Sequence, residues 1–108
     1  SVGESEESCR EKGIAYGVGR ALYSGNGRGQ IIGDLSGIVK LVFDEKYGEL
    51  LGAHIIGSEA TELIAELGLA RALEATNEEL FRTIHAHPTL SEAIMEAAGD
   101  AFGQAINI

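Results

Sequence analysis

The sequence has 108 residues, 44% of them hydrophobic and 23% charged, which is typical of one globular domain with a modest core. A net charge of −9 argues against nucleic acids and anionic membranes as partners, and no apolar run approaches the ~20 residues of a membrane span. The chain begins with Ser1 rather than Met, so we expect a fragment of a longer protein.

The first residues predict a short strand followed by a helix. Val2-Gly3 is interpreted as the end of a strand, Ser5 as a helix N-cap with acidic residues in the first turn, and Gly13 as the helix end. Cys9, the single cysteine, excludes an internal disulfide. Its acidic neighbours do not favour a thiolate, so we interpret Cys9 as an ordinary helix residue.

The next stretch contains many glycines. Residues 14–23 predict a strand weakened by two glycines. Residues 25–29, Gly-Asn-Gly-Arg-Gly, suggest a phosphate-binding loop, but they lack the Gly-Lys-Ser/Thr ending and no helix follows. A turn is therefore the favoured interpretation.

Two apolar strands are predicted at 37–43 and 49–56, joined by a hairpin loop at 44–48. Alternation places the first strand's residues on two faces, with Ile38, Lys40 and Val42 on one and Val39, Leu41 and Phe43 on the other.

His54 belongs to the second of these strands. Alternation places it on the same face as Leu50 and Ile56. A single strand histidine among aliphatic residues favours a structural role over a ligand or catalytic role.

The longest predicted helix runs from an N-cap at Ser58 to about Glu74. Its apolar residues are spread over most of the circumference, so two of its sides need a cover. The sheet supplies one cover, and either a second helix or another subunit supplies the other. We expect a two-fold dimer through this helix and the segment 84–98.

Two capping boxes follow. Thr76 and Glu79 predict the start of a short helix, and Thr89 and Glu92 predict the start of a final helix that continues to about Ala98. Residues from 99 onward are predicted to be a tail.

The segment 84–93 combines features of a proton-transfer site. His87 can titrate near neutral pH, and Pro88 bars it from helical geometry, which predicts a rigid corner. Glu92 has two interpretations, because it can cap the helix or turn toward the His87 ring. A metal site at His85 and His87 is disfavoured, because no further ligands are placed to complete it.

The segment from Ala86 to Ala93, Ala-His-Pro-Thr-Leu-Ser-Glu-Ala, resembles the C-terminal signature of the dihydrolipoyl dehydrogenases, which are FAD- and NAD-dependent disulfide oxidoreductases. The resemblance identifies residues 1–108 as their C-terminal dimerisation domain, without the FAD and NAD domains. It implies an α+β fold, in which an antiparallel sheet of about four or five strands carries helices on one face.

The resemblance also assigns roles to residues. It implies that His87 is the acid–base group for the dithiol and disulfide of the substrate and that Glu92 pairs with it. His87 and Pro88 are then expected near the partner subunit's flavin. His85 matches a family histidine but receives no catalytic role.

The resemblance further implies a homodimer that oxidises dihydrolipoamide with NAD, within a 2-oxoacid dehydrogenase complex, in the cytoplasm or another reducing soluble compartment. The isolated chain is expected to be inactive and to bind neither FAD nor NAD. Two alternatives remain open: a glutathione-reductase-like enzyme, and a dimerisation module without catalysis. Leu90-Ser91 departs from the glutathione reductases, and a Cys-x4-Cys pair upstream in the gene would argue against the second alternative.

Overall fold

The computed structural model describes residues 1–25, 33, 36–83 and 91–101. The described residues form one antiparallel sheet from β1 (Val2–Gly3), β2 (Tyr16–Leu22), β3 (Ile38–Asp44) and β4 (Leu50–Ile56). The strand order is β1-β4-β3-β2, so β2 lies at one edge. The predicted antiparallel sheet of four or five strands is confirmed.

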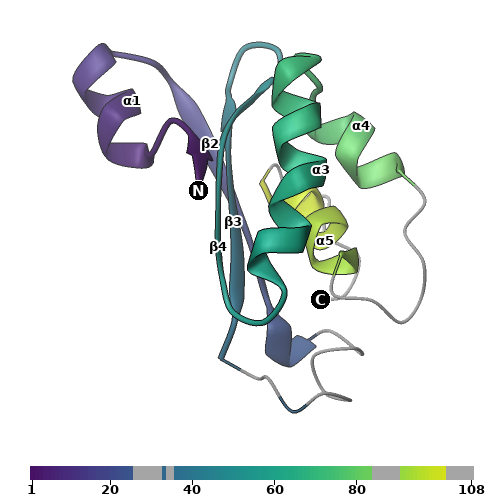
Figure 1. Ribbon diagram of the computed structural model, residues 1–108. Coiled ribbons are helices and arrows are strands. Elements are labelled where there is room, and N and C mark those ends of the chain that lie inside the picture. The colour runs from purple at the N-terminus through teal and green to yellow at the C-terminus, as the bar shows by residue number, and fades with distance from the viewer. Residues whose placement is uncertain (26–32, 34–35, 84–90, 102–108) are drawn as a thin grey trace.

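Three helices cover one face of this sheet, namely α3 (Ala60–Ala72), α4 (Asn77–Arg82) and α5 (Glu92–Asp100). The short helix α1 (Glu6–Lys12) lies on the other side of the sheet (Figure 1). A short 3-10 helix, η1 (Tyr23–Gly25), follows β2. The main core lies between the sheet and the three helices, and its largest fully buried side chains include Phe43, Leu41, Leu50, Leu67 and Ile94.

The predicted ends of α1 are confirmed. The Ser8 amide donates to Ser5 Oγ at 3.1 Å, and the Ser5 amide donates to Ser8 Oγ at 2.9 Å, which completes a capping box. Gly13 ends the helix at φ 70°, in the left-handed region that glycine adopts without steric cost.

A bulge in β4 changes which residues face the core. Val42 pairs with Gly52, but its neighbour Phe43 pairs with Leu50, so Leu51 is an extra residue. Leu50 is therefore turned into the core, while His54 pairs with Lys40 on the opposite face. The prediction that His54 shares a face with Leu50 is wrong, because alternation assumes an uninterrupted strand.

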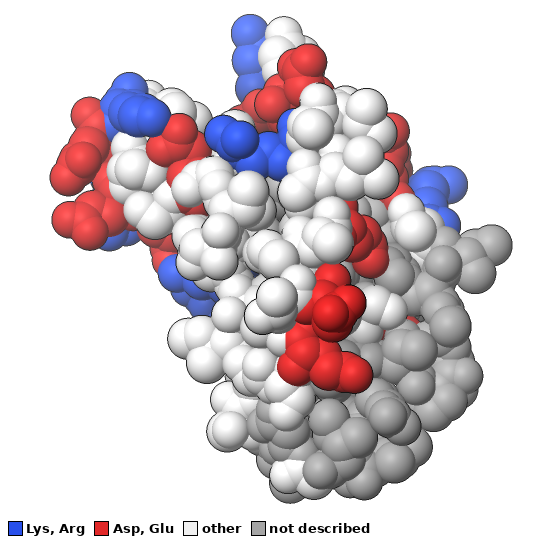
Figure 2. All heavy atoms as spheres, in the orientation of Figure 1, with Lys and Arg blue, Asp and Glu red and all other residues white. Residues whose placement is uncertain are grey.

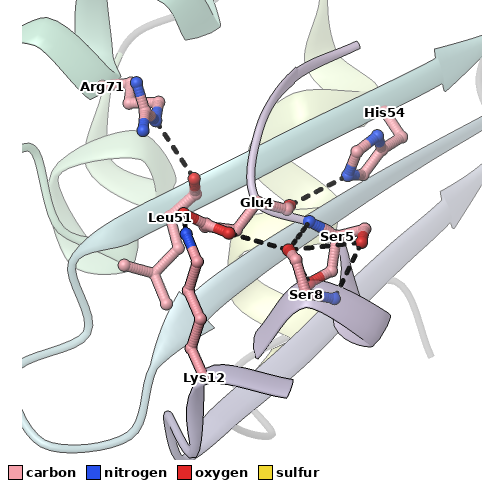
Figure 3. Close-up of polar contacts among 7 residues, drawn as sticks. All are labelled: Glu4, Ser5, Ser8, Lys12, Leu51, His54 and Arg71. Atoms are coloured by element: carbon pink, nitrogen blue, oxygen red, sulfur yellow. Dashed lines mark hydrogen bonds and ion pairs between the residues drawn. The ribbon is translucent and has the colours of Figure 1, made fainter. Parts of the chain in front are cut away.

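Hydrogen bonds from two elements hold the bulge. The Leu51 carbonyl accepts the Glu4 amide at 2.9 Å and Arg71 Nε at 3.1 Å, so both oxygen lone pairs are used (Figure 3). The bulge thereby joins β4 to the N-terminal segment (residues 1–12) and to α3.

Helix α3 begins later than the sequence predicted. Its N-cap is Glu59, at φ 61°, rather than Ser58. The buried Tyr23 accounts for the shift, because its hydroxyl donates to the Ser58 carbonyl at 2.7 Å and its ring lies against Gly57. Ser58 thus belongs to the turn that leads from β4 into the helix.

The prediction that α3 is apolar on two sides is confirmed. Leu63, Leu67 and Ala70 are buried, whereas Leu69 and the C-cap residue Leu73 are 64% and 71% exposed. In Figure 2, residues without charge lie over the upper part of α3, and acidic side chains lie over its lower part. The exposed leucines therefore leave apolar surface next to the core-facing side of the helix.

Candidate active site

Glu92 is the first residue of α5 and is partly buried. Ser91 is the N-cap, and its carbonyl accepts the Ile94 amide at 3.0 Å. The helix therefore begins two residues later than the Thr89 capping box predicted, and Glu92 lies at its first position rather than its third. His85, His87, Pro88 and Thr89 lie outside the described residues. The pairing of His87 with Glu92 stays a prediction.

Helix α4 leads up to this segment and matches its prediction. The Thr76 amide donates to Glu79 Oε1 at 2.7 Å in the expected capping box. At the other end, Thr83 leaves helical geometry at ψ 132°, and its hydroxyl donates to the Glu79 carbonyl at 2.6 Å. The end of α4 and the start of α5 are thus both fixed within the described residues.

Helix α5 lies directly on the edge strand β2. Three residues of β2 face the core, because they pair with the core residues Phe43, Leu41 and Val39. These three residues are all small, namely Gly17, Gly19 and Ala21. A Cβ on Gly19 would come within 1.8 Å of the Ala97 carbonyl oxygen, so the helix and strand backbones are in contact. The residue pattern had indicated only that these glycines weaken a strand.

Asp100 makes a second contact between α5 and β2. Its Oδ2 accepts the backbone amide of Arg20 at 3.0 Å, from a residue 80 positions earlier in the sequence. The sequence interpretation placed residue 99 onward in a tail, whereas α5 extends through Asp100. Nothing in the sequence around Asp100 indicates that its carboxylate binds the Arg20 amide.

The other face of the sheet carries a polar network that includes His54 (Figure 3). His54 Nε2 lies 3.1 Å from the Glu4 carbonyl oxygen, and Nδ1 lies 3.0 Å from Ser1 Oγ. A carbonyl oxygen only accepts, so Nε2 is the donor in the first contact. The geometry supports the structural role that the sequence favoured for His54.

Two glutamates of the N-terminal segment form ion pairs beside this histidine. Lys12 Nζ and Ser8 Oγ both donate to the Glu4 carboxylate at 2.7 Å, and the Lys12 hydrogen bond is the larger cause of the lowered pKa of Glu4. Lys40 contacts the Glu6 carboxylate and, through its hydrogen bond, lowers the pKa of Glu6, while Arg20 lies 3.4 Å from the same oxygen. Figure 2 shows acidic and basic side chains interleaved over α1.

Cys9 lies on the buried side of α1, and burial raises the pKa of its thiol. A thiol held in its protonated form is a poor nucleophile, which agrees with its interpretation as an ordinary helix residue. Within the described ranges, His, Cys, Asp and Glu do not gather in groups of three that could hold a metal ion. The same residues include no helix long and apolar enough to cross a membrane.

The described residues also do not fit a dinucleotide cofactor. Such sites combine a glycine-rich turn after a strand with a helix N-terminus that receives the phosphates. In the described part of the chain, β2 leads into the short η1 and β4 leads into a turn held by Tyr23, so neither strand supplies this arrangement. No contact to FAD or NAD is therefore assigned to the described residues of this chain.

Comparisons with known proteins agree with this architecture. Residues 1–98 match the family described as pyridine nucleotide-disulphide oxidoreductase, dimerisation domain. The chain is 48% identical to a dihydrolipoyl dehydrogenase of Rhizobium etli over 107 residues, and 50% identical to that of Chlorobaculum tepidum over 101 residues. These alignments cover 99% and 94% of the chain but 22% of each relative, so the chain spans about a fifth of their length.

The fold of the chain is also similar to part of a solved structure. The chain superposes on the HOCl-induced flavoprotein disulfide reductase RclA from Escherichia coli with a TM-score of 0.85 at 26% identity, over 91% of this chain and 22% of that one. The sheet, the three helices on one face and the match over residues 1–98 lead to one assignment. The chain belongs to the dimerisation-domain family of the pyridine nucleotide-disulphide oxidoreductases.

Proposed function

We propose that this chain is the C-terminal dimerisation domain of a dihydrolipoyl dehydrogenase and that it supplies an acid–base pair, His87 and Glu92, to the partner subunit's active site. The observation that carries the proposal is 48% identity to a dihydrolipoyl dehydrogenase over 99% of the chain. The position of Glu92 adds support, because it starts a helix that is packed against the sheet.

The proposed chemistry is a proton transfer. Oxidation of the dihydrolipoamide dithiol to its disulfide forms one S–S bond and releases two protons and two electrons. In the parent enzyme, a cysteine pair and bound FAD and NAD, all outside this chain, would supply the acceptors for the two electrons. His87 accepts a proton from a substrate thiol, and an ionised Glu92 beside the ring stabilises the resulting imidazolium.

A homodimer completes the proposed site, because the acid–base pair of one subunit serves its partner. Leu69 of α3 and its C-cap residue Leu73 are exposed, and both line an apolar groove between α3 and α4. Contiguous apolar surface of this kind marks an interface, and in a two-fold dimer the same patch meets itself. Sedimentation of the full-length enzyme should give a dimer, and a monomer at high concentration would contradict the arrangement.

The functional test uses the full-length enzyme with dihydrolipoamide and NAD. His87→Gln should lower turnover by ~10²-fold or more, the usual contribution of a positioned acid–base group. Glu92→Gln should cost less, because an amide can still orient the ring but cannot stabilise its charge. An ionised Glu92 is expected to raise the pKa of His87, so Glu92→Gln should also shift the acidic limb of the kcat profile to lower pH.

His54→Gln is the matched control for this test. It makes the same substitution on the face of the sheet that carries α1, where the ring contacts Ser1 and the Glu4 carbonyl. Its turnover should stay close to that of the unsubstituted enzyme. Equal turnover in His87→Gln and His54→Gln would remove the catalytic assignment.

A further inference from the structure

The contact between α5 and β2 is closer than an ordinary helix–sheet contact. A Cβ on Gly19 would lie 1.8 Å from the Ala97 carbonyl oxygen and 2.9 Å from the Ala101 amide nitrogen. Both are backbone atoms, so no side chain could move aside to make room. The absence of a side chain at residue 19 therefore sets how near α5 comes to the sheet.

The residues around this contact are small on both elements. Ala93, Ala97 and Ala101 are spaced four residues apart along one side of α5, and the first two are fully buried. The facing strand offers Gly17, Gly19 and Ala21. Small residues allow α5 to lie close to β2. They also leave no large side chains on the strand that could prevent the helix from sliding along it.

Asp100 fixes the position of α5 along β2. Its carboxylate accepts the Arg20 amide at 3.0 Å, from the β2 residue that follows Gly19. The two contacts are adjacent on the strand, so together they fix both the distance of α5 from β2 and its position along β2. Glu92 lies eight residues before Asp100, about 12 Å along the same helix at 1.5 Å per residue.

We propose that Gly19 and Asp100 are positioning residues that place the Glu92 carboxylate, through α5, where the acid–base site requires it. This inference rests on the proposed function. It goes beyond that function by assigning roles to two residues that lie outside the signature segment. A rigid helix held at its far end transmits a displacement to its first residue, whereas a loosely held helix would leave Glu92 free to shift.

The first test compares two glycine substitutions in the full-length enzyme. Gly19→Ala forces α5 away from β2. Gly52→Ala is its matched control, because a Cβ there would also come within 1.8 Å of a carbonyl oxygen, that of Glu4, on the opposite face. Both variants should lower Tm. Gly19→Ala alone should lower kcat by roughly 10–100-fold, the scale that a ~1 Å misplacement can produce, and should shift the acidic limb in the direction of Glu92→Gln.

The second test covers the case in which Gly19→Ala does not fold. Asp100→Ala removes the acceptor for the Arg20 amide, and Asp100→Asn restores one through its amide oxygen. Asp100→Ala should lower kcat severalfold with the same displacement of the acidic limb, and Asp100→Asn should recover both. If neither aspartate variant changes kcat or the pH profile, the inference is wrong.

The outcomes also separate this inference from the proposed function. Superimposable pH profiles and equal kcat for Gly19→Ala and Gly52→Ala would show that both glycines serve stability alone. If His87→Gln and Glu92→Gln impair turnover in that case, only the positioning roles fail. If those two variants leave turnover intact, the proposed function fails first.

Discussion

On each face of the sheet, a backbone carbonyl of the covering segment lies against a glycine of a strand, but different interactions stabilise the two contacts. On one face the Ala97 carbonyl approaches Gly19, and on the other the Glu4 carbonyl approaches Gly52, each leaving no space for a Cβ. Around the first contact the side chains are apolar and buried. On the second face Val42 and Cys9 are also buried, but the glutamates of the N-terminal segment are ion-paired and partly exposed.

This difference has a physical consequence. Apolar burial does not depend on the charge of any side chain, so the packing of α5 on the sheet should persist over a wide pH range, with the Asp100 carboxylate as its one titratable contact to β2 among the described residues. The ion pairs of the N-terminal segment depend on ionised glutamates and are weakened by acid and by salt. The face that positions the proposed site is therefore expected to be less sensitive to pH and salt than the face that carries the N-terminal segment.

The largest expected effect comes from truncating the apolar face. Phe43→Ala should lower the free energy of unfolding by about 3–5 kcal/mol, because a fully buried ring is removed and a cavity remains. Its neighbour Val42 is also fully buried but lies on the opposite face of the sheet, the face of Lys40 and His54. Val42→Ala should cost about 1.5 kcal/mol, from roughly 0.8 kcal/mol per buried CH2 group. Urea unfolding of the 108-residue chain measures both, and equal losses would remove the contrast between the faces.

The arrangement of these two faces could be predicted only in part. The alternation of β3 and the caps of α1 and α4 are local patterns, and the sequence predicted each of them. The bulge at Leu51 depends on the Glu4 amide and on Arg71, and the start of α3 depends on Tyr23. These partners lie far apart in the sequence, so no local pattern predicts the contacts between them.

The candidate site follows the same division. The signature segment drew attention to His87 and Glu92 because histidine, proline and glutamate at that spacing have a chemical meaning. Gly19 and Asp100 carry no such meaning by themselves, since their significance lies in a contact between residues 80 or so apart. Residues that act through backbone contact are therefore the ones that reasoning from sequence misses.

A smaller loss of stability is expected when the Glu6–Lys40 pair is removed, and this loss should depend on pH, unlike the loss from the apolar face. The pKa of Glu6 is lowered in the folded chain, so its pairing adds stability above the ordinary value of 4.5, and this stability is lost as pH falls through the folded pKa. Lys40→Met should cost below about 1 kcal/mol at neutral pH, as is usual for a partly exposed pair. The cost should shrink on acidification, whereas the loss from Phe43→Ala should not.

A double-mutant cycle isolates that pair. Lys40→Met, Glu6→Gln and the double variant are unfolded at neutral pH and again at a pH below the ordinary value of 4.5. The coupling between the two positions should be present at the first pH and reduced at the second. Coupling that does not change with pH would mean that Glu6 and Lys40 stabilise the N-terminal segment by packing rather than by charge.

The smallest expected effect is at Glu4, whose carboxylate receives Lys12 and Ser8 at the surface. Glu4→Gln keeps an oxygen that can accept from Ser8 and leaves the backbone carbonyl that holds His54 untouched. The ion pair with Lys12 and its hydrogen bond to the second carboxylate oxygen are lost, but both lie at the surface, so Tm should fall less than in Lys40→Met. The Debye length falls to about 3 Å at 1 M salt, close to the 2.7 Å separation of the Lys12–Glu4 pair, so the difference from the unsubstituted chain should shrink there. A decrease of the same size in 1 M salt would show that the Glu4 carboxylate contributes through its hydrogen bonds rather than its charge, and the two faces would then differ less than the ion pairs indicate.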